Sequence, residues 1–245
     1  MATIDEGAPQ RPLSQLTGKE GPRGQRRPLL ELCVGYGLIL ATIWTPRPQQ
    51  QWLWWISVLW ILATTWASFP GWQAMGFRRG GFLPSLWVVF AALLFAAGAV
   101  AAAIHLHTLR NPISARSWVM TFGGYTVWSF MQQFLLQGYF LFRLLRLLPR
   151  PEWAVLVAAG IFSAAHLPNP VLTPITLIWG LTACIVFLRY RNVYPLAAAH
   201  AILGITVAIT IPGPVMHNMR VGLGYLTYHA HHRHSEGMEP PTARP

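Results

Sequence analysis

Two histidines and three glutamines lie in the most apolar stretches of the chain, and their types are the ones suited to chemistry there. They are Gln132, Gln133, Gln137, His166 and His200. Polar groups at membrane depth find no water, so they usually face a protein interior and often mark a functional site. An imidazole can exchange a proton near neutral pH, whereas an amide only donates and accepts hydrogen bonds. No aspartate or glutamate is close to these five residues in the sequence.

Three kinds of site are compatible with this set of side chains. A zinc site would use both imidazoles, but two ligands are fewer than zinc requires, and amide oxygens bind zinc poorly. A proton path usually needs a carboxylate or more ionisable groups in series. A structural network of glutamine–histidine hydrogen bonds would hold helices together, each paired group contributing about 1 kcal/mol.

Composition places these residues in a membrane protein. Of the 245 residues, 53% are hydrophobic and only 10% are charged, and the mean hydropathy is +0.40. A soluble domain carries about 25% charged residues, so a soluble helical protein would lack the charge to cover its surface. The net charge of +11 comes from bases spread through the loops, which positive-inside topology explains better than nucleic-acid binding. We expect an all-α, polytopic transmembrane bundle with no nucleic-acid partner.

Apolar runs predict about seven spans, within a range of six to eight. They cover residues 29–45, 50–69, 82–104, 118–148, 152–167, 171–189 and 193–211. About 20 residues cross a bilayer, so the fourth run is too long for a simple crossing. The loops that lie inside when the N-terminus is cytoplasmic hold more bases than the others, which predicts that orientation, in the plasma membrane of a bacterium.

The segments outside these runs are polar. Residues 1–28 are expected to be a disordered basic tail, 29–211 the membrane domain, and 212–245 an interfacial segment with a polar, histidine-rich tail.

Cys33 and Cys184 fall inside predicted spans and are expected to be small core residues. Arg78 and Arg79, between glycines, are expected to anchor a loop at the inner leaflet. Trp179 is expected at a membrane interface or in the core.

The fourth run carries its polar residues on one face. Their spacing is four residues throughout, and they are Tyr125, Ser129, Gln133 and Gln137, with Gln132 beside them. Side chains at this spacing share one face of a helix, so the stripe should face other helices and not lipid. Arg143, farther along, is expected to extend to the inner interface.

The ordered set of motifs resembles the CPBP family of intramembrane peptidases, which includes CAAX prenyl endopeptidases and bacteriocin-processing proteins. Residues 132–137, Gln-Gln-Phe-Leu-Leu-Gln, occupy the frame of its Glu-Glu-x-x-x-Arg motif. Phe162 and His166 match its Phe-x-x-x-His motif. His200 matches the histidine of its third motif, where Gly204 replaces an asparagine or aspartate. The resemblance covers about residues 118–205.

The resemblance implies that a water, activated by the first glutamate with help from the histidines, attacks a peptide carbonyl at membrane depth. It assigns catalytic positions to Gln132, Gln133, His166 and His200, and no metal. Substrate-binding positions would be Gln137, Phe162 and Gly204. Because an amide cannot accept the proton, His166 or His200 would have to be the base in an active enzyme. Glu31 and Glu152, the acids nearest the core, are not well placed to replace the lost carboxylates.

Three functions follow as alternatives. The first is an intramembrane endopeptidase, which the two retained histidines favour. The second is a pseudopeptidase that binds such segments as a scaffold or chaperone, which the amides favour. The third is an unrelated lipid-handling protein. Expected partners are membrane lipids and a membrane-embedded or lipidated peptide. No cofactor is expected, a divalent metal between His166 and His200 being the weaker alternative. Counting along the helices leaves these histidines ~10 Å apart in depth, so their meeting tests the site.

Overall fold

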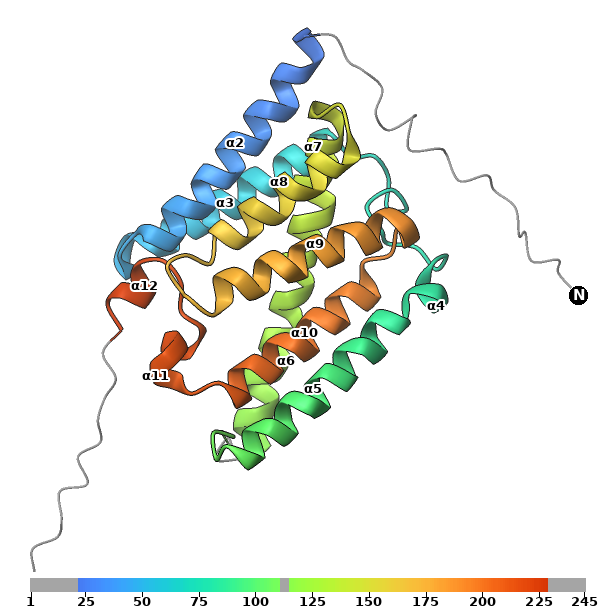
Figure 1. Cartoon of the computed structure of the whole chain (residues 1–245). Helices are drawn as coiled ribbons and strands as arrows, with labels where there is room; N and C mark the ends of the chain where they lie inside the picture. Colours follow the sequence, from blue (N-terminus) through green and yellow to red (C-terminus); the bar gives the residue numbers. More distant parts are fainter. Residues whose placement is uncertain (1–21, 111–114, 229–245) are drawn as a thin grey trace, which may run out of the picture.

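The computed structural model describes residues 22–110 and 115–228, and every regular element in these two ranges is helical (Figure 1). In chain order the helices are α2 (Pro22–Trp44), α3 (Arg47–Ala67), α4 (Phe82–Ser85), α5 (Trp87–His105), α6 (Ala115–Gln133), the π-helix η1 (Phe134–Leu141), α7 (Phe142–Leu147), α8 (Pro151–Ala164), α9 (Leu172–Tyr190), α10 (Tyr194–Thr210), α11 (Gly213–Met216), the 3-10 helix η2 (His217–Met219) and α12 (Leu223–Leu226). The all-α prediction is confirmed. Most of the predicted N-terminal tail and the histidine-rich stretch after residue 228 lie outside the described residues.

Each predicted span has a helical counterpart. Three helical segments are long and apolar enough to cross a membrane: Gly24–Trp44, Phe82–His105 and Leu172–Tyr190. Two further apolar helices, α8 and α10, are shorter. The first helix begins at Pro22, earlier than predicted, and its first turns include Arg27, which pairs with Glu31 one turn later. The structure thus supports an integral membrane protein, while the number of seven spans stays a prediction.

The long central helix positions the other elements. It comprises α6, η1 and α7 without interruption, and it crosses behind α9 and α10 in Figure 1. Helix α10 packs on both α5 and α6, α8 packs on α9, and α2 packs on α3. The π-helix η1 contacts both α8 and α9. One continuous helix therefore brings side chains to α8, α9 and α10 in turn.

Prolines set several of the helix ends. Pro151 and Pro195 stand in the first turns of α8 and α10, where the missing N–H removes no helical hydrogen bond. Pro168 and Pro170 follow the end of α8 and prevent it from continuing into α9. The α8–α9 loop is in turn held by Asn169, whose amide donates to the carbonyls of Met216 and Arg220 at 2.8 and 3.0 Å. The first part of the C-terminal segment is therefore fastened to the helical body.

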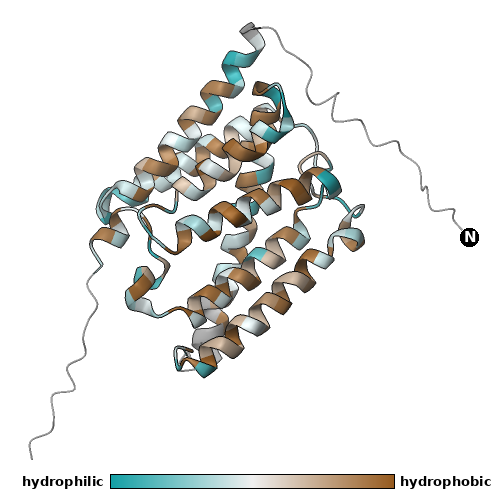
Figure 2. Cartoon of the chain, in the orientation of Figure 1, coloured by the Kyte–Doolittle hydropathy of each residue, from teal (hydrophilic) through white to brown (hydrophobic). Residues whose placement is uncertain are grey.

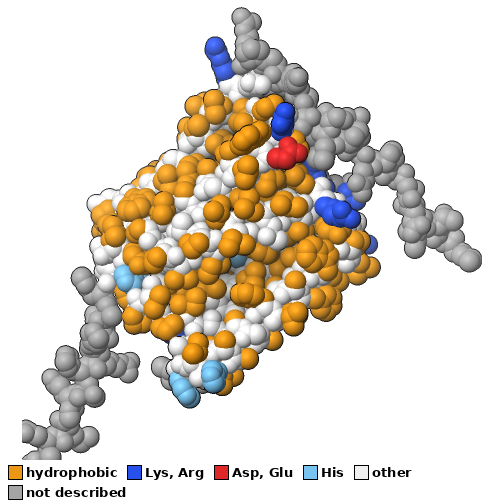
Figure 3. Space-filling model, in the orientation of Figure 1, with side chains coloured by type: hydrophobic (Ala, Val, Ile, Leu, Met, Phe, Trp, Pro, Cys, Tyr) orange, Lys and Arg blue, Asp and Glu red, His pale blue; other side chains and the backbone are white. Residues whose placement is uncertain are grey.

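Apolar side chains cover the outside of the helices. Figure 3 shows hydrophobic groups over most of one face, with the visible arginines near one edge and histidines near the opposite corner. In Figure 2 the hydrophilic residues likewise concentrate towards helix ends and connections. Trp66 and Leu94 are among the most exposed apolar residues, at 82% and 77%. Such a surface is stable against lipid and not against water.

The interior is densest around η1. Leu136, Tyr139 and Leu141 of this helix are fully buried, and Ala158 of α8 and Ala183 of α9 belong to the same apolar cluster. Small residues on the facing helices let the backbones approach closely. Cys184 is buried in the same cluster, as predicted, whereas the prediction that Cys33 is a core residue is wrong, because its side chain is exposed on α2.

A buried ion pair links the first helix to the long helix. Arg143 donates through Nε to Glu31 Oε2 at 2.9 Å and through Nη2 to Ser68 Oγ at 3.2 Å. Its guanidinium also lies 3.8 Å from the centre of the Tyr139 ring. The prediction that Arg143 extends to the membrane interface is therefore wrong. Glu31, 112 residues away in sequence, offsets the cost of burying the charge, and no local pattern reveals such a partner.

Candidate functional site

The polar stripe of the long helix faces the protein interior. Ser129, Gln133 and Gln137 are buried and Tyr125 is half-buried, whereas Val127, Trp128 and Met131 on other faces of the helix are exposed. The four-residue spacing therefore gave the correct orientation for this helix. Gln132, beside the stripe, is half-buried.

The stripe is joined to α10 through one histidine. Gln133 Nε2 lies 3.0 Å from His200 Nδ1, and both side chains are buried. With the amide nitrogen facing the ring, Gln133 donates and His200 Nδ1 accepts, so the ring proton sits on Nε2. Gln137 Nε2 approaches Gln133 Oε1 at 3.5 Å and extends the chain of polar groups by one turn. Gln133, and not Gln132, thus makes the direct contact with a histidine.

The π-helix begins directly after Gln133. It runs from Phe134 to Leu141 and contains Gln137. The wide π-turn is rare, and it occurs frequently at functional sites because it shifts side chains from their α-helical positions. Here the π-helix follows α6, which contacts α10, and itself contacts α8 and α9. No spacing of residues in this run predicted the change in helix type.

The two histidines meet at Phe162. The Phe162 ring centre lies 5.0 Å from that of His166 and 6.0 Å from that of His200, both in edge-to-face geometry. His166 lies in the turn after α8, which ends at Ala164. The depth difference counted along straight helices therefore does not separate the two rings. Gln133, Phe162, His166 and His200 form one cluster, which we call the histidine site.

His166 has a defined tautomer. Its Nδ1 lies 2.8 Å from the carbonyl oxygen of Phe162, and because that oxygen can only accept, Nδ1 must donate. The Nε2 atom of the neutral ring is then left with a lone pair. His200, by contrast, presents a proton on Nε2 when Gln133 donates to it. The two imidazoles thus differ in kind, one offering an acceptor and the other a donor.

Trp179 is a site residue that the sequence did not single out. Its ring centre lies 5.8 Å from that of His200, and the side chain is only 8% exposed. Among the buried atoms without a hydrogen-bond partner in the described structure are Trp179 Nε1 and Gln137 Oε1. Buried polar atoms are nearly always paired, so these two atoms are available for a further hydrogen bond. A signal that could have located Trp179 is the set of small residues that follow on α9, which are Gly180, Ala183 and Cys184.

Gly204 lies against Tyr125. A Cβ built on Gly204 would collide with the Tyr125 hydroxyl, so the phenol of α6 occupies the space that a side chain on α10 would fill. Gly204 stands one turn after His200 on the same helix. The glycine is therefore required by a close approach between helices, and the hydroxyl group that reaches this position comes from α6.

Among the described residues, no hydrogen bond or ion pair joins a carboxylate to the histidine site. Glu31 and Glu152 are the acids in the described ranges. Glu31 is engaged by Arg27 and Arg143, each at 2.9 Å, and Glu152 is exposed in the first turn of α8. The same ranges hold no group of three or more histidines, cysteines or acids that could bind a metal. The site that the structure describes offers imidazoles and amides as its polar groups.

Fold and site together define a class: a helical, apolar membrane protein with a glutamine stripe and two histidines that meet between its helices. The model of a protein family, type II CAAX prenyl endopeptidase Rce1-like, matches residues 114–206. The match extends from the start of α6 through most of α10 and includes every residue of the histidine site. It confirms the resemblance seen in the motifs, since over this segment the chain is similar to the type II CAAX prenyl endopeptidases. No curated protein and no solved structure shows a significant match.

Proposed function

We propose that the histidine site binds a membrane-embedded or lipidated peptide segment and does not catalyse its hydrolysis. The observation that carries this proposal is the hydrogen bond between Gln133 and His200. An amide stands in the motif frame where the related peptidases have a carboxylate. The histidine that would assist a base is instead bonded to a group that cannot accept a proton.

Loss of the base explains why hydrolysis would be slow. A water attacking an amide carbonyl must lose a proton, and a positioned base typically contributes 10²–10⁴-fold to the rate. Gln132 and Gln133 cannot supply it, and the buried acid Glu31 is bonded to Arg143. A neutral, hydrogen-bonding site can still hold a peptide group.

The unpaired atoms at the site match the needs of a peptide group. Trp179 Nε1 is a donor and Gln137 Oε1 is an acceptor, and neither has a partner in the described structure. A backbone carbonyl and N–H in the membrane need such groups, because lipid provides none. The His200 ring lies near Trp179, and the Phe162 ring supplies an apolar contact. We infer a client segment whose backbone is locally exposed, as at a helix break or a free end.

A second candidate is slow hydrolysis with a histidine base. The observation that favours it is the Phe162 carbonyl bond, which leaves His166 Nε2 free to accept a proton. His200 would then donate from Nε2 to the developing oxyanion. Water gives one proton to His166 while its oxygen bonds to the carbonyl carbon. The tetrahedral intermediate then collapses, the C–N bond breaks, and the leaving amine takes the proton from His166.

A cleavage and binding experiment separates the two candidates. The purified full chain is mixed in micelles with a prenylated peptide or a single-span transmembrane peptide, each carrying a fluorophore and a quencher. Wild type is compared with Gln132→Glu, Gln133→Glu and His166→Ala, with the exposed Gln49→Glu as a matched control. We expect wild type to bind without cleaving, and a glutamate variant to gain cleavage.

The contrary results are distinct. Cleavage by wild type that disappears in His166→Ala would support the histidine-base enzyme and refute the binding-only proposal. Neither binding nor cleavage in any variant would refute both, and would favour the lipid-handling alternative. A gain of cleavage in Gln49→Glu would show that the added charge, and not its place, is responsible.

We also propose the bacterial plasma membrane, with a cytoplasmic N-terminus, as the location.

A further inference from the structure

Two loops far apart in sequence are fastened together at one end of the helices. The loop after α3 meets the α9–α10 turn, where Asn192 Nδ2 donates to the carbonyls of Arg78 and Gly80 at 2.6 and 3.3 Å. The backbone N–H of Val193 donates to the Gly76 carbonyl at 3.1 Å. Gly81, at a φ of 76°, lies so close to the Tyr190 carbonyl that a Cβ would collide with it. These contacts make a fixed frame.

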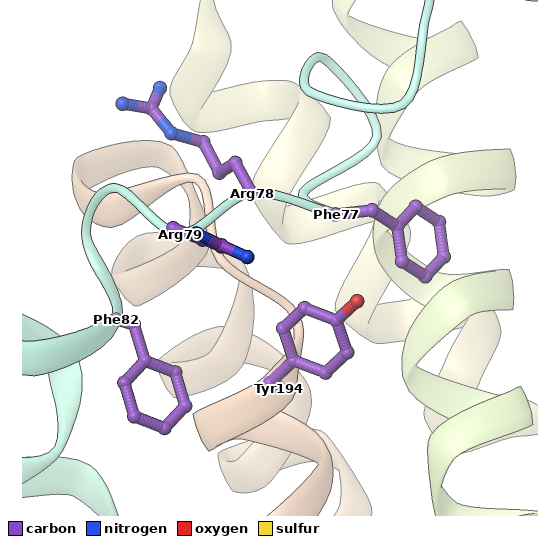
Figure 4. A pocket seen from close by; sticks show the side chains of 5 residues that line it. All are labelled: Phe77, Arg78, Arg79, Phe82 and Tyr194. Atoms are coloured by element: carbon purple, nitrogen blue, oxygen red, sulfur yellow. The ribbon is translucent and has the colours of Figure 1, made fainter.

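The frame gathers four arginines: Arg78 and Arg79 on the first loop, Arg189 in the last turn of α9, and Arg191 at the end of that helix. Two hollows open beside them. One, of about 410 Å³, is lined by Phe77, Arg78, Arg79, Phe82 and Tyr194, and Figure 4 shows its two arginines on the loop and Tyr194 on α10. The other, of about 390 Å³, is lined by Arg78, Gly81, Pro84, Arg189 and Tyr190. Arg78 lines both hollows, which we call together the arginine hollow.

Within residues 22–110 and 115–228, the arginines of the hollow have no carboxylate partner. In the ranges the structure describes, the ion pairs join Glu31 to Arg27 and Arg143, and none involves the four arginines of the hollow. The positive charges of these arginines lie close enough to affect one another. Burial, and then the charge of Arg78, lower the pKa of the half-buried Arg191 guanidinium from its ordinary value. A gathered set of like charges on a fixed frame is stabilised by an anion.

The shape and the surroundings specify the kind of anion. Guanidinium groups bind phosphate oxygens through paired hydrogen bonds, and fixed positions favour a compact, multiply bonded group. The hollow lies at the ends of the apolar helices α9 and α10, where headgroups meet water, and Phe77 and Phe82 add apolar walls. We propose that the arginine hollow is a phosphate-binding site, occupied by the headgroup of an anionic lipid or by a free phosphate group.

Occupancy would act on the histidine site through α10. Tyr194 is the first residue of this helix, and His200 follows six residues later, or ~9 Å along the axis. A bound phosphate would fix the start of α10 and therefore the depth of His200. The proposal does not depend on the proposed function, since a phosphate could bind whether or not a peptide does.

The test uses the full chain in mild detergent and two probes. Native mass spectrometry measures retention of phosphatidylglycerol against phosphatidylcholine, and thermal unfolding compares inorganic phosphate with chloride at equal ionic strength. Arg78→Gln, which alters both hollows, is compared with Arg150→Gln, an exposed arginine in the α7–α8 connection. We expect phosphatidylglycerol to be retained preferentially, and retention to fall about tenfold in Arg78→Gln only.

Each outcome decides the proposal. A phosphate-induced rise in unfolding temperature without lipid retention, lost in Arg78→Gln, would support the site and assign it to a free phosphate group. Equal retention of both lipids with no effect of phosphate would overturn it. An equal loss in Arg78→Gln and Arg150→Gln would also overturn it, because general charge would be the cause. If Arg78→Gln fails to fold, Arg79→Gln and Arg189→Gln each test one hollow.

Discussion

The long helix carries two buried polar clusters, one around Arg143 and one around Gln133, which differ in how completely their polar groups are paired. At Arg143 the polar group is charged, and a carboxylate, a hydroxyl and an aromatic ring surround it. At Gln133 the groups are neutral, and some nearby polar atoms have no partner in the described residues. The first cluster is complete and holds α2 against the long helix. The second leaves polar atoms unpaired among the described residues, which agrees with the proposed role of the histidine site in binding a peptide.

Breaking the charged cluster should have the largest effect. Glu31→Gln leaves Arg143 buried without its carboxylate, and breaking a buried pair in this way costs about 3–5 kcal/mol of folding stability. Thermal unfolding in micelles measures it, with the exposed Glu152→Gln as the matched control. Equal stability of the two variants would show that the Glu31–Arg143 pair does not fasten the fold.

Filling the Gly204 position should have the next largest effect. Gly204→Ala puts a methyl group into the Tyr125 hydroxyl, and overpacking of this kind typically costs about 1–3 kcal/mol. The same change in a Tyr125→Ala background should cost less, since the colliding group is gone. A double-mutant cycle followed by thermal unfolding measures the coupling. Independent, additive costs would contradict the contact between α6 and α10.

Removing the hydrogen bond between Gln133 and His200 should have the smallest effect on folding stability. Gln133→Leu deletes the bond to His200 and should cost about 1 kcal/mol, because hydrogen bonds between membrane helices are weak on average. Gln132→Leu, at the half-buried neighbour, should cost less. If Gln133→Leu were as damaging as Glu31→Gln, the histidine site would be a structural fastening like the charged cluster, and the comparison between them would fail.

Local periodicity accounts for what the sequence predicted correctly. The four-residue spacing from Tyr125 to Gln137 gave the buried face of the long helix, and the apolar runs gave every long helix. Periodicity failed to predict the position of a side chain where that position depends on a residue far away in the sequence. Arg143 stands near a helix end and was expected to extend outward, but Glu31 holds it inside. Which of Gln132 and Gln133 contacts His200 likewise depends on the position of α10.

The motif order revealed the histidine site, yet not its details. His166 and His200 were expected to form one site, and both lie against Phe162. The Trp179 contact was hidden because a tryptophan in a span serves equally as an interfacial anchor. The π-helix lies where α8 and α9 contact Phe134–Leu141, and the spacing of residue types did not predict it.

The contact between Gly204 and Tyr125 also constrains the order in which substitutions can accumulate. Asparagine at 204 would restore the family's third motif, but the phenol already occupies its place. Introducing the asparagine first would destabilise the protein, whereas introducing it after a smaller residue at 125 would not. Glutamates at 132 and 133 alone would leave this part of the motif incomplete. The contact between α6 and α10 thus makes the full family motif hard to build by single substitutions.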